Sequence, residues 1–126
     1  MTRINVGVDP KELCREHLLA ECREIKRIPN AIRSGKAKLS GIPDKFTLGK
    51  GHVKFFYNKL LYLKNRYESL YAEAISRGYD MTYFGGAWDG VNKSLMNDYV
   101  PTERDRLIVM ERINERLLGM KKHETS

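Results

Sequence analysis

Apolar residues recur every three or four positions between Val53 and Ala74, and this spacing constrains the fold more than any other feature of the chain. The residues are Val53, Phe56, Leu60, Leu63, Tyr67, Leu70 and Ala74. An α-helix with about 3.6 residues per turn places them on one face, so the pattern predicts a long helix from about residue 51 to Gly78, where the glycine suits a C-terminal cap. We interpret the aromatic members of this stripe as core packing rather than as a base-stacking surface.

An earlier helix is predicted by the sequence Asp9-Pro10-Lys11-Glu12. Asp9 suits the N-cap, Pro10 suits the first helical position, and Glu12 lies where a capping box places its carboxylate. We expect this helix to end at about Lys26, because a proline follows three residues later. Its apolar face would contain Leu13, Leu18, Ala20 and Ile25. Residues 29–51 are rich in glycine, proline and lysine, and this composition predicts a basic, partly flexible loop.

A third helix is predicted to follow the irregular residues 79–101. Thr102-Glu103-Arg104-Asp105 forms a capping pattern, and the helix should run to about Met120. Its expected buried residues are Leu107, Met110, Ile113 and Leu117. Residues 1–8 and 121–126 are expected to be irregular, and no alternating strand pattern is present. The sequence therefore predicts an all-α fold: a single compact domain, residues 1–126, of three main helices with long irregular connections.

The charge balance favours a polyanionic partner. The chain has 126 residues, with 23 Lys and Arg against 16 Asp and Glu, which leaves a net charge of +7. Nucleic acid is the first such partner to consider. No apolar run approaches the roughly 20 residues of a membrane-spanning helix, and the N-terminus lacks a signal-like apolar stretch. We expect a soluble, intracellular protein that binds no membrane.

The two cysteines, Cys14 and Cys22, are expected to be reduced thiols. Both fall on the predicted first helix, where a separation of about 12 Å prevents an intrachain disulfide. Cys14 and His17 lie one turn apart and could share a metal ion, but no second pair of ligands follows them. The sequence therefore predicts no metal site.

The start of the chain contains an amine that can act as a nucleophile. Thr2 is small enough to permit removal of Met1, which frees its α-amino group. The pKa of an α-amine is about 7.7 to 8.0, against about 10.4 for lysine, so a useful fraction is unprotonated near neutral pH. In a strongly basic chain this amine suggests Schiff-base chemistry on DNA. The alternative is an ordinary frayed terminus, which the terminus alone favours.

Charged side chains gather on the predicted first helix. His17, Glu24 and Arg27 fall near one face of this helix, and Arg23 lies beside that face. Such a cluster is either a solvated set of salt bridges or a site that grips phosphates while it retains one acid. The residue types alone favour the solvated cluster about two to one.

Several stretches of the sequence match a known family together. They are Thr2-Arg3-Ile4-Asn5, then His17-Leu18-Leu19-Ala20-Glu21-Cys22-Arg23-Glu24 with Arg27, then Phe46 to Leu60, Arg77-Gly78-Tyr79 and Asp98-Tyr99-Val100-Pro101. These stretches resemble the pyrimidine-dimer DNA glycosylase family of T-even phages. The resemblance covers about residues 2–120, and its block from Phe46 to Leu60 is too long and specific to be a coincidence.

The resemblance implies a compact all-helical monomer. Such an enzyme excises a damaged base from duplex DNA, above all a cyclobutane pyrimidine dimer, and then nicks the strand as an abasic-site lyase. Neither a metal nor another cofactor is implied. We expect the enzyme to work in the cytoplasm of a bacterium or of a phage-infected host cell.

The resemblance also implies roles for individual residues. Thr2 and Glu24 are implied to be catalytic. The Thr2 amine attacks C1′ of the sugar, and Glu24 stabilises the cationic imine and helps to remove the 2′ proton. The implied DNA-binding residues are Arg3, His17, Arg23 and Arg27.

The chain departs from the phage pattern in several places. One extra residue precedes His17, Glu16 replaces a glutamine, and Cys22 replaces a tyrosine. Residues 121–126 contain no Trp or Tyr, whereas the phage enzyme has an aromatic, basic segment there that contributes to dimer recognition. Two alternatives therefore stay open: a noncatalytic DNA-binding protein, and a related glycosylase for another lesion. Trp88 or Tyr83 could supply another aromatic contact, although core packing is the favoured role of Trp88.

Overall fold

The computed structural model describes residues 2–125, the last six by their backbone. Within this part of the chain it contains helices and no strand. The α-helices are α1 (Arg15–Glu24), α2 (Arg27–Arg33), α3 (His52–Phe55), α4 (Leu60–Ser76) and α5 (Glu103–Thr125). Three short 3-10 helices accompany them: η1 (Pro10–Glu12), η2 (Gly85–Trp88) and η3 (Lys93–Leu95). The all-α prediction is confirmed, with α1, α4 and α5 as the three long helices.

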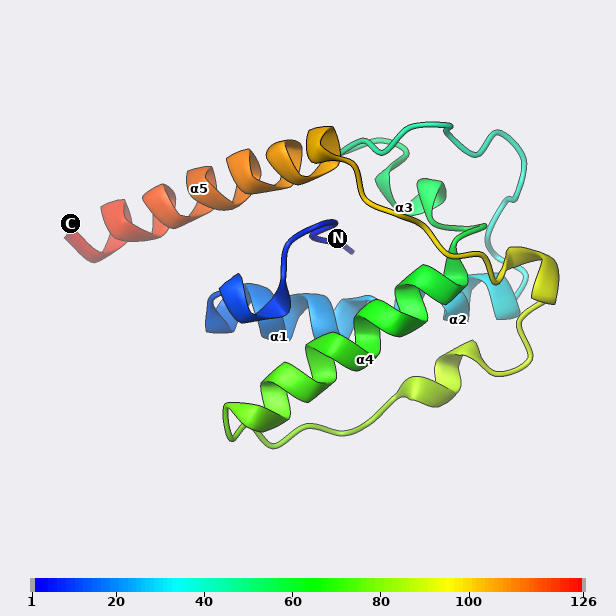
Figure 1. Ribbon diagram of the computed structural model, residues 1–126, viewed down its shortest axis with the longest axis horizontal. Helices are drawn as coiled ribbons and strands as arrows, with labels where there is room; N and C mark the ends of the chain where they lie inside the picture. The colour runs from blue at the N-terminus through cyan, green and yellow to red at the C-terminus, as the bar shows by residue number, and fades with distance from the viewer. Residues whose placement is uncertain (1, 126) are drawn as a thin grey trace.

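The N-terminal segment, residues 2–8, lies between α1 and α5 (Figure 1). It forms neither helix nor strand, as expected, yet Ile4, Val6 and Val8 are buried in the hydrophobic core. That core also contains Leu18 of α1, Leu63 of α4 and the other buried apolar residues of these helices. The start of the chain is therefore a packed structural element, and the frayed terminus considered above is wrong for residues 2–8.

Helix α4 carries the apolar stripe from Leu60 to Ala74, and Val53 and Phe56 lie in and next to α3. Every member from Phe56 to Ala74 is buried, and Val53 is half-buried. The single helix expected over residues 51–78 is divided, however, because Lys59 adopts a non-helical backbone conformation between α3 and α4. Gly78, with a φ of +88°, ends α4 as predicted. The break lets α3 pack its aromatic side chains against Phe46 in the preceding loop.

The first predicted helix is also divided. Asp9 caps as expected, accepting a hydrogen bond from the Lys11 amide at 3.0 Å, but the turn that it starts is the 3-10 helix η1. Helix α1 begins only at Arg15, after the buried Leu13. Pro29 does not stop the chain from being helical. It lies in the first turn of α2, where amide groups have no partner within the helix, so its missing N–H costs nothing.

Helix α5 begins at the predicted capping box. The Asp105 amide donates to Thr102 Oγ1 at 3.1 Å, and the Thr102 amide donates to Asp105 Oδ2 at 3.0 Å. The helix continues through residue 125, so the irregular end expected at residues 121–126 is wrong for residues 121–125; Ser126 lies outside the described residues. Leu107 is 57 % exposed, contrary to prediction, because the buried face is centred on Asp105, Val109 and Ile113.

The loop between α4 and α5 is anchored by Trp88. Its ring is buried and lies 5.4 Å from the ring of Tyr67, which confirms a packing role. Tyr83, in contrast, is about half exposed and interacts with Lys64 and Glu68 at the surface. None of the helices in residues 2–125 is long and apolar enough to cross a membrane.

Candidate active site

A cavity of about 280 Å³ is lined by residues of the N-terminal segment, α1 and α5. We call it the N-terminal cavity. Its polar lining comes from three elements: Arg3 and Asn5 of the N-terminal segment, His17, Glu21 and Glu24 of α1, and Arg112 and Arg116 of α5. The α1 residues share one face because they are spaced by three or four positions. The cavity is therefore lined by charged and polar side chains that are far apart in the sequence.

The structure brings together three of the residues singled out in the sequence. Arg3, His17 and Glu24 all line the N-terminal cavity. Thr2 is 8 % exposed and directly precedes Arg3, so its Cα lies about 3.8 Å from the Cα of a lining residue.

Arg23 and Arg27 lie outside this cavity. Arg23 is exposed on α1, Arg27 is exposed at the start of α2, and both are absent from the lining. Arg27 Nη1 lies 3.9 Å from Glu24 Oε1, with more than half of the Arg27 side chain in solvent. Such an exposed pair contributes little to stability, and the Arg27 guanidinium can exchange this carboxylate for a phosphate at small cost.

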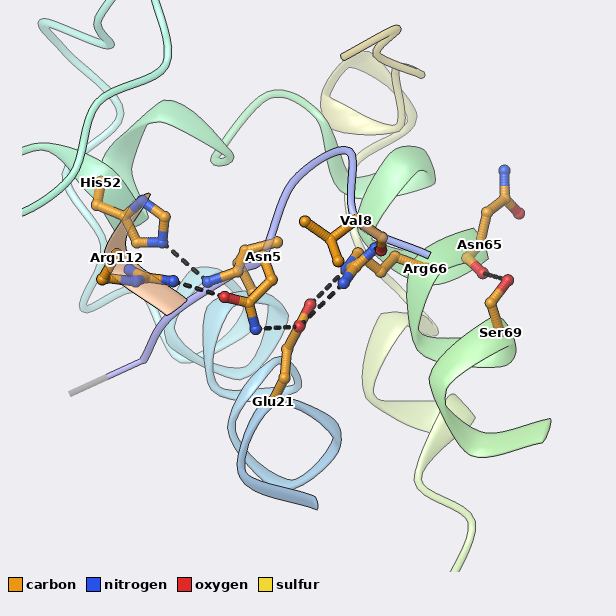
Figure 2. A network of polar contacts seen from close by, with 9 residues as sticks. Asn5, Val8, Glu21, His52, Asn65, Arg66, Ser69 and Arg112 are labelled. Atoms are coloured by element: carbon orange, nitrogen blue, oxygen red, sulfur yellow. Dashed lines mark hydrogen bonds and ion pairs between the residues drawn. The ribbon is translucent and has the colours of Figure 1, made fainter. Parts of the chain in front are cut away.

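Glu21, which lines the N-terminal cavity, belongs to a buried ion pair (Figure 2). Glu21 is 2 % exposed and pairs with Arg66 of α4, whose Nε and Nη2 both donate to its carboxylate. Arg66 Nη1 also donates to the carbonyl oxygen of Val8 at 2.9 Å. This bidentate pair therefore joins α1, α4 and the end of the N-terminal segment.

Asn5 extends this network toward α5 (Figure 2). Its Nδ2 donates to Glu21 Oε1 at 2.7 Å, and its Oδ1 accepts from Arg112 Nη2 at 2.7 Å. Both ends of the amide are used, which fixes its orientation. The side chain of Asn5 consequently holds the N-terminal segment at a fixed place between α1 and α5.

His52 of α3 contacts the same segment from another side. Its Nε2 accepts a hydrogen bond from the Ile4 amide at 2.9 Å, and its Nδ1 lies 2.8 Å from the carbonyl oxygen of Thr47. Burial, opposed by the bond to Thr47, lowers the pKa of His52, with Arg112 and Arg3 acting in the same direction as burial. The ring is therefore neutral at pH 7.

Three guanidinium groups, those of Arg3, Arg112 and Arg116, line the cavity together with Glu24. Burial, and then the charge of Arg3, lower the pKa of Arg112 to about 10, so its guanidinium remains protonated near pH 7. Burial, followed by the charges of Arg116 and Arg112, lowers the pKa of His17, whose Nδ1 is buried with no hydrogen-bond partner among the described residues. A neutral imidazole and several guanidinium groups therefore face the same space, which suits an anionic ligand.

A second cavity, of about 900 Å³, continues the first along α5. The two share Arg3, His17, Arg112 and Arg116, and the second extends to Leu48 and Gly49 in the loop before α3. The three shared arginines therefore lie where the two cavities join into one groove, and they can contact a polyanionic ligand there. The lining of this groove also contains the carboxylates of Glu16, Glu21, Glu24 and Glu115.

Several of these residues were not identified in the sequence as parts of the site. The arginines of α5 carry a usable signal, because Arg112 and Arg116 are spaced by one turn and fall on one helix face. Arg66 and His52 have no such signal in the sequence, because they contact residues far from them in the chain. Arg66 contacts Val8, 58 residues away, and His52 contacts Ile4, 48 residues away.

The geometry and the sequence agree with one enzyme family. A family model described as pyrimidine dimer DNA glycosylase matches residues 1–84, which include the N-terminal segment, α1, His52 and Arg66. The match covers 84 of the 126 residues, and the chain therefore belongs to the pyrimidine dimer DNA glycosylase family.

Proposed function

We propose that this DNA glycosylase excises damaged bases, cyclobutane pyrimidine dimers first among them, from duplex DNA and then cleaves the strand at the resulting abasic site. The intermediate is an imine between C1′ of the deoxyribose and the α-amine of Thr2, freed by removal of Met1. The observation that carries this proposal is the N-terminal cavity, whose lining includes both the residue next to Thr2 and Glu24. The amine and the carboxylate can thus act on one sugar.

In the first step the Thr2 nitrogen replaces the base at C1′ of the deoxyribose. The nitrogen of Thr2 forms a bond to C1′, and the bond between C1′ and the base breaks, with its electron pair leaving on the base, which takes up a proton. The nitrogen loses a proton, and its lone pair then forms the C1′=N bond as the C1′–O4′ bond breaks and O4′ takes up a proton, which opens the sugar ring and leaves a protonated imine. Glu24 stabilises this cation through its carboxylate. The positive charge of Arg3 disfavours the unreactive ammonium form of the amine, whereas the Glu24 carboxylate favours it.

The second step breaks the strand. The imine acidifies the 2′ carbon, and the Glu24 carboxylate accepts the 2′ proton. The electrons form a double bond between C2′ and C3′, and the C3′–O bond breaks, so the 3′ phosphate leaves with the electron pair. Water then hydrolyses the imine, which releases the sugar aldehyde and regenerates the amine. No step uses a metal or a cofactor.

The arginines hold the DNA in this proposal. Arg3, Arg112 and Arg116 line the groove and neutralise phosphates next to the reacting sugar, while Arg23 of α1 and Arg27 of α2 contact the DNA backbone from their exposed positions. His17, which lines the cavity, faces the bound substrate near the amine in this proposal. The damaged nucleotide leaves the base stack more easily than a paired one, and this difference gives lesion selectivity without readout of each base.

Borohydride trapping on abasic duplex DNA tests the nucleophile. The chain with a free Thr2 amine should give a covalent complex with DNA, and the same chain with its α-amine chemically blocked should give none while it still binds DNA. Undiminished trapping by the blocked chain would refute the assignment of Thr2.

Glu24→Gln tests the carboxylate. We expect the rate of strand cleavage to fall about 10²- to 10⁴-fold, the usual contribution of a positioned acid or base, with DNA affinity changed only slightly. Glu111→Gln is the matched control, because Glu111 is exposed on α5 outside both cavities. An equal loss of affinity and rate in Glu24→Gln would instead make Glu24 a structural residue.

A panel of duplexes, each with one lesion, tests the substrate. Preferential cleavage of the pyrimidine-dimer duplex supports the proposal. Preference for an oxidised or alkylated base would assign another lesion to the same chemistry. Salt-sensitive binding to damaged and intact duplexes alike, without strand cleavage, would identify a noncatalytic DNA-binding protein.

A further inference from the structure

We infer that His52 is a positioning residue for the proposed reaction: by accepting a hydrogen bond from the Ile4 amide, it holds the segment that carries the Thr2 amine against the N-terminal cavity. This inference rests on the proposed function. It concerns a residue of α3 that makes no contact with the reacting atoms in that proposal.

The two hydrogen bonds of His52 fix the protonation of its ring. The carbonyl oxygen of Thr47 can only accept, so Nδ1, at 2.8 Å, carries the ring proton. The backbone amide of Ile4 can only donate, so Nε2, at 2.9 Å, must be free of a proton. The anchor therefore exists only with a neutral ring in this one tautomer.

The ring itself is held in place by the core. It is 3 % exposed and makes edge contacts with the rings of Phe46 and Phe56, whose centroids lie 5.4 and 5.5 Å away. The ring cannot turn without opening this aromatic cluster. His52 thus fixes the position of Ile4 with respect to this buried aromatic cluster.

Ile4 is close enough to the chain start for this anchor to matter. An extended chain covers at most about 3.6 Å per residue, so the amides of Ile4 and Thr2 are separated by no more than about 7 Å. Asn5 holds the other side of Ile4 through Glu21 and Arg112. Without the bond to His52, the Ile4 backbone loses the polar contact that sets its position, and apolar packing with the Asn5 contacts is what remains to hold residues 2–4, so the amine can take up more than one position in the cavity.

Protonation of His52 removes the anchor. The charged groups that face the ring come from three elements: Arg3 from the N-terminal segment, Glu21 from α1 and Arg112 from α5. Burial and the two arginines lower the pKa of His52, whereas the Thr47 carbonyl and Glu21 raise it. Below that pKa, Nε2 carries a proton that points at the Ile4 N–H, and the two donors repel each other.

Three variants separate positioning from stability. His52→Leu removes the acceptor, and His52→Gln offers a carbonyl oxygen that does not titrate. Trp88→Phe is the control for a loss of core stability. Trp88 is buried, lines neither cavity, and its indole nitrogen has no hydrogen-bond partner among the described residues. Thermal unfolding is used to choose a temperature at which every variant is folded.

Two readouts are made on each variant. The first is the hydrogen-exchange rate of the Ile4 amide in the protein without DNA, and the second is the rate constant of borohydride trapping at saturating abasic DNA. We expect His52→Leu to raise the exchange rate at least tenfold and to lower the trapping rate constant at least tenfold. His52→Gln should restore a substantial part of both, and Trp88→Phe should change neither.

The pH dependence gives an independent comparison. As the pH falls through the lowered pKa of His52, the trapping rate of the wild type should fall relative to that of His52→Gln, whose side chain cannot be protonated. This comparison carries the test should His52→Leu fail to fold.

Three outcomes overturn the inference. Unchanged Ile4 exchange in His52→Leu shows that no anchor exists, and faster exchange with unchanged trapping shows that the anchor does not position the amine. A ratio of wild-type to His52→Gln rates that is constant with pH shows that the ring protonation has no effect. Failure of the proposed function is recognised separately, since the wild type itself then gives no trapped complex although its Ile4 amide remains protected.

Discussion

Glu21→Leu is the substitution whose cost follows most directly from the structure. Glu21 and Arg66 are 2 % and 9 % exposed, and the change leaves the Arg66 guanidinium buried without its counter-charge. Removing one partner of a buried ion pair costs about 3–5 kcal/mol of the free energy of unfolding. The Nδ2 donor of Asn5 also loses its acceptor, which places the expected loss in the upper part of this range.

Urea denaturation at pH 7 measures this loss. For a chain of this size the expected decrease in stability corresponds to a fall of about 10–20 °C in the melting temperature. Glu12→Leu is the matched control, because Glu12 pairs with Arg106 at 3.8 Å in an exposed position. Loss of such a surface pair should cost less than about 1 kcal/mol.

A double-mutant cycle then tests the cause of the loss. Arg66→Met should cost as much as Glu21→Leu, because it leaves the carboxylate buried and unpaired. The double variant removes both charges, so it should be more stable than the sum of the two losses predicts, by about 2–3 kcal/mol. Losses that add to within about 0.5 kcal/mol would refute the reasoning, since they would show that the two charges do not depend on each other.

Three further predictions concern the titratable groups and the groove. Because burial lowers the pKa of His52 below its ordinary value of about 6.5, the unfolded chain binds more protons than the folded chain below that pH, and the free energy of unfolding should decrease as the pH falls from 6.5. Denaturation curves at pH 7, 6 and 5 measure this decrease, which should be about 1.4 kcal/mol per pH unit at most for this group, and a flat profile would contradict it. Arg116→Ala should reduce the slope of log affinity for DNA against log salt by about 0.9 if Arg116 neutralises one phosphate, and fluorescence anisotropy at several salt concentrations checks this. Burial raises the pKa of Cys22 to about 11, so mass spectrometry should show that iodoacetamide at pH 8 modifies Cys22 at least 100-fold more slowly in the folded chain than in urea, and equal rates would exclude a protected thiol.

Local signals in the sequence, namely apolar periodicity and a capping box, predicted the long helices α4 and α5. The stripe from Phe56 to Ala74 identified α4, and the capping box at Thr102 located the start of α5, because both signals are local. The divisions of the predicted helices were missed. Neither the backbone turn at Lys59 nor the tolerance of Pro29 in a first turn changes the apolar spacing that marks a helix.

The site was predictable only in part, for a similar reason. His17 and Glu24 share a face of one helix, so helical geometry predicts that they lie together. The residues that hold the N-terminal segment act over long distances in the sequence. Asn5 and Arg112 are 107 residues apart, and Glu21 and Arg66 are 45 residues apart. No periodicity in a single chain relates such positions.

The long reach of the N-terminal segment has a consequence for biosynthesis. Its partners His52 and Arg112 are 60 positions apart (112 minus 52). A ribosome that adds about 5–20 residues per second needs roughly 3–12 s to synthesise the chain between them. Until α5 has emerged, the beginning of the polypeptide lacks its final partner and stays accessible. An aminopeptidase that removes Met1 therefore has its best opportunity during translation, before Thr2 reaches its native burial of 8 % exposure.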